Sequence, residues 1–344
     1  MVNENKKEVM FRVEDMKVWF PVTKGLLKRV IGHVKAVDGV SFEVYKGETL
    51  GIVGESGCGK TTVGKAIMML ERPTGGKVEF NYDGEMRDVT KFKKKDLFNF
   101  RRKVQMVFQD PYSALNPMKK VSVAMNEPLI VHGMKDAAER EKTINEVLDL
   151  VNIPRAYLNK FPHEFSGGQR QRVCIARALE ISPEVVVCDE AVSALDVSIQ
   201  AQVLNLLKEI QKQRNLTFVF IAHDLSVVQY MSDRIAVMYL GKVVEIADSR
   251  ELHKSVFHPY TQSLLSAVPV PVLHYQKKRI ILKGDVPSPI NKPSGCPFHN
   301  RCERCMEICK TVEPDPIHYG EGNHMVACHL YTEEGKAEMA KNAQ

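Results

Sequence analysis

The stretch that decides the fold is residues 48–62, ETLGIVGESGCGKTT. Its first six residues predict a short buried strand. Residues 54–61 follow that strand as a glycine-rich loop, and a helical pattern extends from the loop to Leu70. Glycines between a strand and a helix let backbone N–H groups curl round a polyphosphate, and the positive end of the helix faces the same anion. Lys60 is placed to reach the β- and γ-phosphates and Thr61 to offer its hydroxyl to Mg²⁺. The segment therefore predicts a phosphate-binding loop, whose expected contacts are Gly54, Glu55, Ser56, Gly57, Cys58, Gly59, Lys60, Thr61 and Thr62.

A second acidic motif follows an apolar run at residues 185–190, VVVCDE. The apolar residues predict a buried parallel strand, and the carboxyl ends of such strands are where a doubly wound sheet binds its ligands. Asp189 is expected to coordinate Mg²⁺ or to lie in its second shell. Glu190 is expected to act as general base on the water that attacks the γ-phosphate. Two acids at a strand end are often merely solvent-exposed, but here a phosphate-binding loop accompanies them.

The composition is that of an ordinary globular chain of 344 residues, 44% hydrophobic and 26% charged, with a formal net charge of +6. We find no run of eighteen apolar residues and no charged-then-apolar leader, so the chain is expected neither to span a membrane nor to be secreted by itself. The basic patch within residues 91–103 is interpreted as a solvated or membrane-facing surface, and no nucleic-acid partner is expected.

Residues 164–172, EFSGGQRQR, precede a helical pattern and form a second glycine-relaxed anion site. Here the chain resembles the ABC ATPase family, whose signature loop matches Ser166, Gly167, Gly168 and Gln169, with Phe165 where Leu is commonest. The resemblance implies ATP and Mg²⁺ as ligands and a head-to-tail dimer, in which each signature loop caps the ATP of the partner. Since the chain has one phosphate-binding loop and one signature loop, the second cassette must come from another molecule.

The same resemblance assigns further roles. Gln109 matches the glutamine that contacts Mg²⁺ and joins the core to the helical subdomain, so the expected Mg²⁺ contacts are Thr61 and Gln109. Residues 193–196, SALD, match a loop that crosses the dimer interface, and His223 matches the histidine that contacts the γ-phosphate and orients Glu190. The expected catalytic residues are thus Glu190, His223, Lys60 and Gln109. Ala191 stands where the family usually has Pro, which should relax that turn without removing a catalytic group.

The resemblance also implies an aromatic that stacks on adenine. We choose Phe20, with Trp19 as the alternative, because residues 21–33 have the character of an insertion before the strand-forming residues 34–44. The expected fold is an α/β cassette with a RecA-like core, an antiparallel β subdomain and a helical subdomain, plus a small C-terminal cysteine-containing domain. The predicted divisions are 1–107 for the core with its phosphate-binding loop, 108–182 for the helical subdomain, 183–262 for the rest of the core and 263–344 for the appendage.

The appendage contains residues 284–290, GDVPSPI, and residues 293–302, PSGCPFHNRC, and resembles the ATPase subunits of oligopeptide and dipeptide importers. Cys296, Cys302, Cys309 and Cys328 match recurrent positions of that subfamily. Clustered soft thiolates suit an iron–sulfur cluster or a zinc site, and we favour a [4Fe–4S] cluster. Zn²⁺ is the alternative, with His299, His324 or His329 as substitute ligands, and reduced cysteines in a hydrophobic minicore are a third reading. Cys305 is an extra thiol within the cluster.

The preferred hypothesis is an ATP-hydrolysing subunit that energises the import of di- or oligopeptides. It would lie on the cytoplasmic face of the cell membrane as a peripheral protein. Its expected partners are a second ATPase subunit, related or identical, two membrane permeases that dock on the helical subdomain, and an extracytoplasmic peptide-binding protein. The alternative is a soluble ABC-type ATPase that is not coupled to transport, which usually carries two cassettes or a coiled-coil insertion. A non-catalytic regulatory subunit should lack Glu190 or His223, and both are present.

Overall fold

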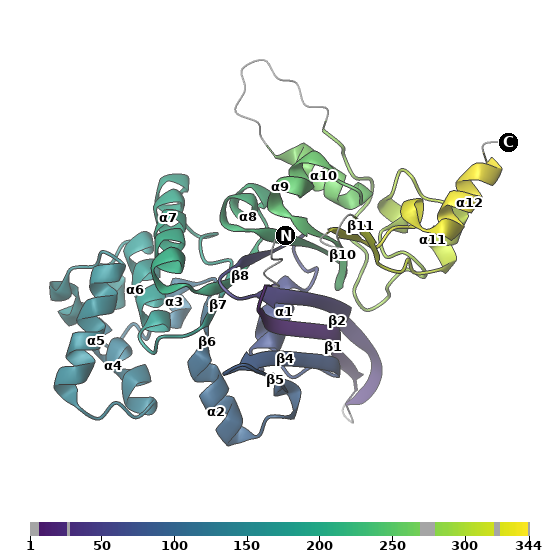
Figure 1. Cartoon of the computed structure of the whole chain (residues 1–344). Coiled ribbons are helices and arrows are strands. Elements are labelled where there is room, and N and C mark those ends of the chain that lie inside the picture. Colours follow the sequence, from purple (N-terminus) through teal and green to yellow (C-terminus); the bar gives the residue numbers. More distant parts are fainter. Residues whose placement is uncertain (1–6, 26–27, 269–278, 320–323, 343–344) are drawn as a thin grey trace, which may run out of the picture. The chain divides into compact units, whose positions relative to one another are not determined.

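The computed structural model describes residues 7–25, 28–268, 279–319 and 324–342 (Figure 1). The chain divides into two compact units, and each is built from separate segments. Residues 1–11, 44–49 and 80–222 form the first unit, and residues 12–43, 50–79 and 223–344 form the second. Both units combine helices with strands, as the predicted α/β class requires. No helix among the described residues is long and apolar enough to cross a membrane.

The first unit is organised round three parallel strands in the order β8-β7-β6. Every residue of β7 and β8 is buried, because helices cover both faces of such a sheet and the strands are apolar throughout. The predicted strand before Asp189 is confirmed. The strands of this unit are β5 (Glu85–Asp88), β6 (Val104–Val107), β7 (Val185–Asp189) and β8 (Thr217–Ala222).

Most helices of the first unit lie between β6 and β7 in the sequence, and α3 to α6 form one group in Figure 1. In α5 the buried residues Ile144, Val147 and Leu148 recur at helical spacing and face the group. In α7, Val203 and Ile210 recur at helical spacing and are each at most 1% exposed. The helices are α2 (Lys94–Lys103), α3 (Pro111–Ala114), α4 (Val121–Val131), α5 (Ala137–Leu150), α6 (Gly167–Leu179) and α7 (Val197–Arg214).

The second unit contains five paired strands in the order β11-β12-β10-β9-β3. Strand β3 runs parallel to β9, whereas β9, β10, β12 and β11 pair antiparallel in turn. The strands are β3 (Thr49–Val53), β9 (Arg234–Tyr239), β10 (Lys242–Asp248), β11 (Ile317–Tyr319) and β12 (His324–Val326). The helices are α1 (Lys60–Ile67), α8 (Leu225–Met231), α9 (Ser249–Lys254), α10 (Pro259–Ala267), α11 (Glu307–Thr311) and α12 (Glu333–Asn342).

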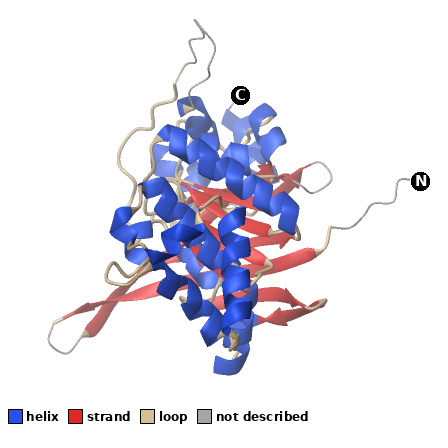
Figure 2. Ribbon diagram, turned by 90° about the vertical axis from the view of Figure 1, so that its left-hand side faces the viewer, coloured by secondary structure: helices blue, strands red, loops and turns tan. Residues whose placement is uncertain are grey.

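A four-stranded sheet in the order β2-β1-β4-β5 contains the long hairpin of β1 (Val9–Lys24) and β2 (Arg29–Tyr45), together with β4 (Gly75–Tyr82) (Figure 2). The predicted antiparallel β region is thus present. The expected insertion at residues 21–33 stays a prediction, and the structure shows strand conformation that continues through Lys24 and resumes at Arg29. Most of that segment therefore extends the hairpin, because β-branched and aromatic residues suit the pleated backbone.

The C-terminal region is not set apart as the small domain that the sequence suggested. Strand β12 pairs with β10, with Glu245 opposite Val326, so this region extends the sheet that begins at β3. Val326, Cys328 and Leu330 form a buried cluster. Residues 269–278 of the predicted appendage lie outside the described residues. The predicted boundaries at 107, 182 and 262 stay predictions.

Candidate nucleotide-binding and hydrolysis site

The predicted phosphate-binding loop connects the buried strand β3 to helix α1 in the second unit. Gly59 is the N-cap of α1 and adopts a left-handed backbone at φ 104°, which an L side chain rarely adopts. A Cβ on Gly54 would collide with the carbonyl oxygen of Met238, and one on Gly59 with that of Ala36. The loop therefore needs glycine at both positions, for close approach to neighbouring backbone as well as for an anion.

Lys60 lies inside this loop with only 4% of its surface exposed. Its Nζ donates hydrogen bonds to the carbonyl oxygen of Gly54 at 2.8 Å and to that of Glu55 at 3.1 Å. The side chain thus folds over the loop, where its positive charge is held among backbone dipoles. Burial raises the pKa of the neighbouring Cys58 thiol, so this cysteine acts as a small buried residue of the loop. Thr61 and Thr62 are half-buried in the first turn of α1.

The acidic motif lies at the end of β7 in the first unit. Asp189 is 3% exposed, whereas Glu190 is half-buried and adopts a left-handed backbone at φ 46°. Non-glycine residues in that conformation cluster at functional sites, because the surrounding structure must hold them there. Here the Glu190 N–H donates to Ile221 O at 2.9 Å, and Ser193 donates from its N–H and its hydroxyl to Glu190 O. Ala191 is buried at this turn.

The structure brings Gln109 and Glu190 together, although 81 positions separate them. Gln109 Nε2 donates to Glu190 Oε2 at 2.9 Å. With its NH₂ group engaged in this way, the amide oxygen of Gln109 is left as the atom available to a hard cation.

The predicted signature loop forms the N-terminus of α6. Ser166 is its N-cap and makes a reciprocal capping box with Gln169, because Gln169 N donates to Ser166 Oγ at 3.3 Å and Ser166 N donates to Gln169 Oε1 at 3.1 Å. Gly168 is buried, and a Cβ there would collide with Ile199 Cγ2. The four residues are thus held at the positive end of a 13-residue helix, which favours an anion.

Three further predicted residues lie at the surface or near it. His223 follows β8 and is exposed, and it belongs to the second unit. Phe20 is 38% exposed on β1. Trp19 is half-buried: its Nε1 donates to Asp38 Oδ1 at 3.0 Å, and the Lys35 ammonium lies 4.5 Å from its ring centroid. The choice between Phe20 and Trp19 as adenine-stacking residue stays a prediction.

Comparison with known proteins identifies the family of this chain. The family model for ABC transporters matches residues 37–193, and the model for the C-terminal region of oligopeptide/dipeptide transporters matches residues 244–309. The chain is 49% identical over 329 residues to the oligopeptide transport ATP-binding protein AppF of Bacillus subtilis (strain 168), covering 95% of this chain and 98% of that protein. The chain belongs to the family of oligopeptide/dipeptide ABC transporter ATP-binding proteins.

Other relatives agree with this family. The dipeptide transport ATP-binding protein DppF of Haemophilus influenzae is 42% identical over 331 residues, which covers 96% of this chain and 100% of that protein. The solved dimer of the ATP-binding cassette MJ0796 in a post-hydrolysis state, bound to ADP and Pi, matches with a TM-score of 0.61 and 29% identity, over 70% of this chain and 99% of that chain. The predicted ABC ATPase cassette fold is therefore confirmed, and this ABC protein is an ATPase.

The predicted cysteine centre of this ABC protein lies in the second unit. Cys296, Cys309 and Cys328 are buried and Cys302 is half-buried. Burial is the main cause that raises the pKa of Cys296 to about 12, and the thiols of Cys328, Cys309 and Cys302 contribute to this rise, so they lie within electrostatic reach of Cys296. Among the described residues, however, no three His, Cys, Asp or Glu side chains converge closely enough to hold one metal ion.

The histidines proposed as substitute zinc ligands have other partners. His324 Nε2 lies 2.8 Å from Glu245 Oε1, His329 Nε2 lies 2.9 Å from Val312 O, and His299 Nδ1 lies 2.9 Å from Cys296 O. A tetrahedral zinc site needs four donors about 2.0–2.3 Å from one ion. The described geometry therefore does not support the zinc alternative.

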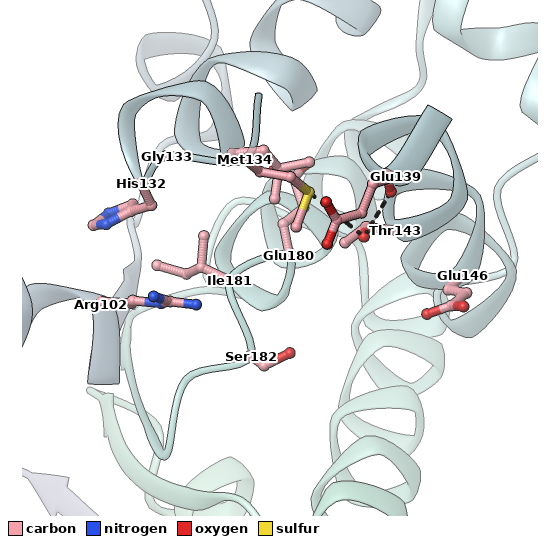
Figure 3. Close-up of a pocket in the computed structure, with 11 residues that line it drawn as sticks. Arg102, His132, Gly133, Met134, Glu139, Thr143, Glu146, Glu180, Ile181 and Ser182 are labelled. Carbon is pink, nitrogen blue, oxygen red and sulfur yellow. Dashed lines mark hydrogen bonds between the residues drawn. The ribbon is translucent and has the colours of Figure 1, made fainter. Parts of the chain in front are cut away.

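One feature of this ABC protein was not indicated by any of the sequence motifs. A pocket of about 370 Å³ in the first unit is bordered by polar residues of α2, α5 and the end of α6, including Arg102, Glu139 and Glu180 (Figure 3). Glu180 is 2% exposed, and neither carboxylate oxygen has a hydrogen-bond partner in the described part of the chain. Burial raises its pKa to about 9, against a smaller opposing effect of Arg177.

The signal for Glu180 was present in the sequence. Val173 and Ala176 mark the buried stripe of α6, and position 180 continues it at a spacing of four. A carboxylate on the buried stripe of a helix is an exception to the usual pattern of burial, and it predicts a raised pKa unless a cation accompanies it.

Proposed function

We propose that this chain is the ATP-hydrolysing subunit of an ABC transporter that imports di- or oligopeptides, and that it acts on the cytoplasmic face of the membrane. The observation that carries the proposal is the union, in one chain, of an ABC cassette with the C-terminal region of oligopeptide/dipeptide transporters. The relatives AppF and DppF are named for transport of oligopeptides and dipeptides respectively. These names support the substrate class of peptides, without a preference for length.

In the proposed mechanism the loop at residues 54–62 binds the phosphates of ATP through its backbone N–H groups and Lys60. Thr61 and Gln109 would hold Mg²⁺ through side-chain oxygens, and Asp189 would act from the end of β7. When bound, Mg²⁺ would neutralise negative charge on the phosphates. The hydrogen bond from Gln109 to Glu190 supports this assignment, because it fixes the orientation of the amide.

Glu190 is the proposed general base, and His223 the proposed contact to the γ-phosphate. Glu190 would accept a proton from the attacking water, and the hydrogen bond from Gln109 helps to orient its carboxylate. The rigid turn at φ 46°, with its hydrogen bonds to Ile221 and Ser193, holds the carboxylate in one orientation. Positioning of this kind accounts for much of the rate gain in phosphoryl transfer.

The proposed partner across the nucleotide is a second ATPase subunit, identical or related. Residues 166–169 form a capped helix N-terminus that suits a phosphate, while the chain's own phosphate-binding loop serves a different phosphate group. The solved cassette MJ0796, of the same fold, is dimeric. ATP would close such a dimer and hydrolysis would release it.

The proposed membrane partners are two permeases that dock on the helical part of the first unit, with an extracytoplasmic peptide-binding protein beyond them. Large apolar side chains are exposed there within a span of 24 residues. They are Phe108, Tyr112, Met118, Val123, Ile130 and Val131, with exposed fractions between 44% and 84%. Exposed apolar side chains close together mark protein or membrane contacts more often than free surface.

We further propose that Cys296, Cys302, Cys309 and Cys328 hold a [4Fe–4S] cluster. The donor set supports it, because four mostly buried thiols in mutual electrostatic reach are soft ligands for iron. When bound, the cluster would contribute cross-links between chain segments, and Cys305 stays outside the proposed set.

The experiment that tests the proposed function uses the Glu190→Gln variant of the full chain with its co-expressed permeases in vesicles. We expect unchanged ATP binding and a loss of hydrolysis of roughly 10²-fold or more, as for the removal of a general base. Wild-type vesicles should take up peptide only with ATP and the binding protein. Vigorous hydrolysis that no peptide or permease affects would favour the alternative, an ABC ATPase not coupled to transport.

A further inference from the structure

A bidentate ion pair connects the C-terminal region to the phosphate-binding loop within the second unit. Arg301 Nη1 donates to Glu55 Oε2 at 2.6 Å, and Nη2 donates to Glu55 Oε1 at 3.2 Å. The Arg301 side chain is 8% exposed and that of Glu55 is 28% exposed. Two parallel hydrogen bonds between a guanidinium and a carboxylate fix both the position and the orientation of the two groups.

The segment that carries Arg301 is itself rigidly packed. Phe298, three residues earlier, is 1% exposed, and its ring centroid lies 5.2 Å from that of Tyr239 and 5.4 Å from that of Tyr260. Tyr260 also contacts the loop directly, because its hydroxyl accepts a hydrogen bond from the Glu55 N–H at 2.9 Å. Tyr260 thus holds the backbone of Glu55, and Arg301 holds its side chain.

Glu55 occupies a sensitive place in the loop. It lies between Gly54 and Ser56, and its carbonyl oxygen accepts hydrogen bonds from Lys60 Nζ at 3.1 Å and from Cys58 N at 3.2 Å. A carboxylate in a loop that binds polyphosphate repels that ligand unless a cation accompanies it. Arg301 supplies this cation, and it also draws the carboxylate toward the C-terminal region.

We propose that Arg301 is a positioning residue of the nucleotide site, which neutralises and orients Glu55 and thereby links the cysteine-bearing segment to the affinity of the loop for ATP. This inference rests on the proposed nucleotide-binding role of residues 54–62. Cys302 follows Arg301 directly, and Cys296 is tied to Cys309 through a backbone hydrogen bond at 2.8 Å. A change in the cysteine segment that moves Arg301 would therefore reach the phosphate-binding loop through one ion pair.

The test measures binding of a fluorescent ATP analogue and the ATPase kinetics of the full chain. Arg301→Gln keeps much of the side-chain length and removes the charge, so Glu55 is left uncompensated beside the phosphates. We expect the KM for ATP and the Kd of the analogue to rise roughly tenfold, with a smaller change in kcat. Arg301→Lys, which keeps the charge but not the bidentate geometry, should lie between wild type and Arg301→Gln.

Two further variants separate positioning from a merely structural role. In the double variant Glu55→Gln/Arg301→Gln no unpaired carboxylate remains, so the Kd should return most of the way to that of wild type. Arg304→Gln removes an exposed charge from the same segment and should leave the Kd unchanged. An Arg301→Gln protein with wild-type Kd, or a double variant no better than Arg301→Gln, would overturn the proposal. A wild-type chain that binds no ATP would instead refute the proposed function.

Discussion

Replacing Glu180 by glutamine should remove the part of the pH dependence of stability that this one buried carboxylate causes. Glu180 is 2% exposed at the end of α6, and both of its oxygens lack hydrogen-bond partners in the described part of the chain. Its ordinary pKa is 4.5, and burial raises the pKa to about 9 in the folded chain. The folded state therefore keeps the proton over a pH range in which the unfolded chain releases it.

The size of the effect follows from linkage. For a group whose folded pKa is raised, the stability contribution is fully present below the unfolded pKa and is lost as pH rises toward the folded pKa. Between roughly pH 5.5 and pH 8 the folded state binds about one proton more, so the free energy of unfolding falls by about 1.4 kcal/mol per pH unit. Over that range the loss is about 3 kcal/mol, a large part of a typical domain's stability. The amide that replaces the carboxyl group in the variant has no proton to lose.

The assay is urea unfolding followed by far-UV circular dichroism at several pH values. The measured quantity is the difference in unfolding free energy between the Glu180→Gln variant and wild type at each pH. Differences are used because the buried imidazole of His258, whose pKa burial lowers to about 4, also changes stability, in the acid range. Its contribution weakens as pH falls below the ordinary histidine value, in wild type and variant alike.

We expect the difference to grow in favour of the variant by about 1.4 kcal/mol per pH unit between roughly pH 5.5 and pH 8. The matched control is Glu146→Gln, which changes an exposed carboxylate that borders the same pocket and should give a flat difference. A flat difference for Glu180→Gln as well would show that Glu180 is ionised in the folded chain, and the reasoning from burial would be refuted.

Three other outcomes are expected. Gly168→Ala should lower the free energy of unfolding by about 1–3 kcal/mol, because the added Cβ meets Ile199. Gly167→Ala should lower it less, and equal decreases in the melting temperature of the two variants would contradict this. Glu245→Gln should lower stability by about 2–4 kcal/mol, because this fully buried carboxylate accepts from Phe257 N and His258 N and pairs with His324, whereas exposed Glu251→Gln should not. Anaerobically purified protein should be brown and contain about four irons per chain. Cys309→Ser should lose the colour and the iron, and the control Cys174→Ser should keep them. Colourless wild-type protein would refute the cluster proposal.

Local motifs carried most of what the sequence could predict. The strand before Gly54 and the apolar run before Asp189 are short segments whose conformation depends on neighbouring residues, and both elements formed where expected. The adjacent glycines within residues 166–169 likewise lie at the capped N-terminus of a helix, as their pattern predicted. Such features are local, so the chemistry of each loop can be inferred before any long-range contact is known.

Long-range pairing explains what the sequence did not reveal. The strand conformation on either side of residues 25–28 was not predicted, because the hairpin of β1 and β2 depends on cross-strand contacts that no local pattern specifies. The C-terminal segment was expected to be a separate domain, yet β12 joins β10 through only two paired positions, Glu245 with Val326 and Ile246 with Met325. A three-residue strand has too few residues for a periodic signal.

The ion pair between Glu55 and Arg301 shows the same limit at the functional site. The two residues lie 246 positions apart, so neither composition nor spacing could associate them. Taken alone, a glutamate inside a phosphate-binding loop is an electrostatic mismatch, and Arg301 in a histidine- and cysteine-containing turn has no evident use. Their bidentate contact resolves both observations, because the cation that the loop requires is supplied by the C-terminal segment. The proposal that the C-terminal region supports the nucleotide site rests on this contact.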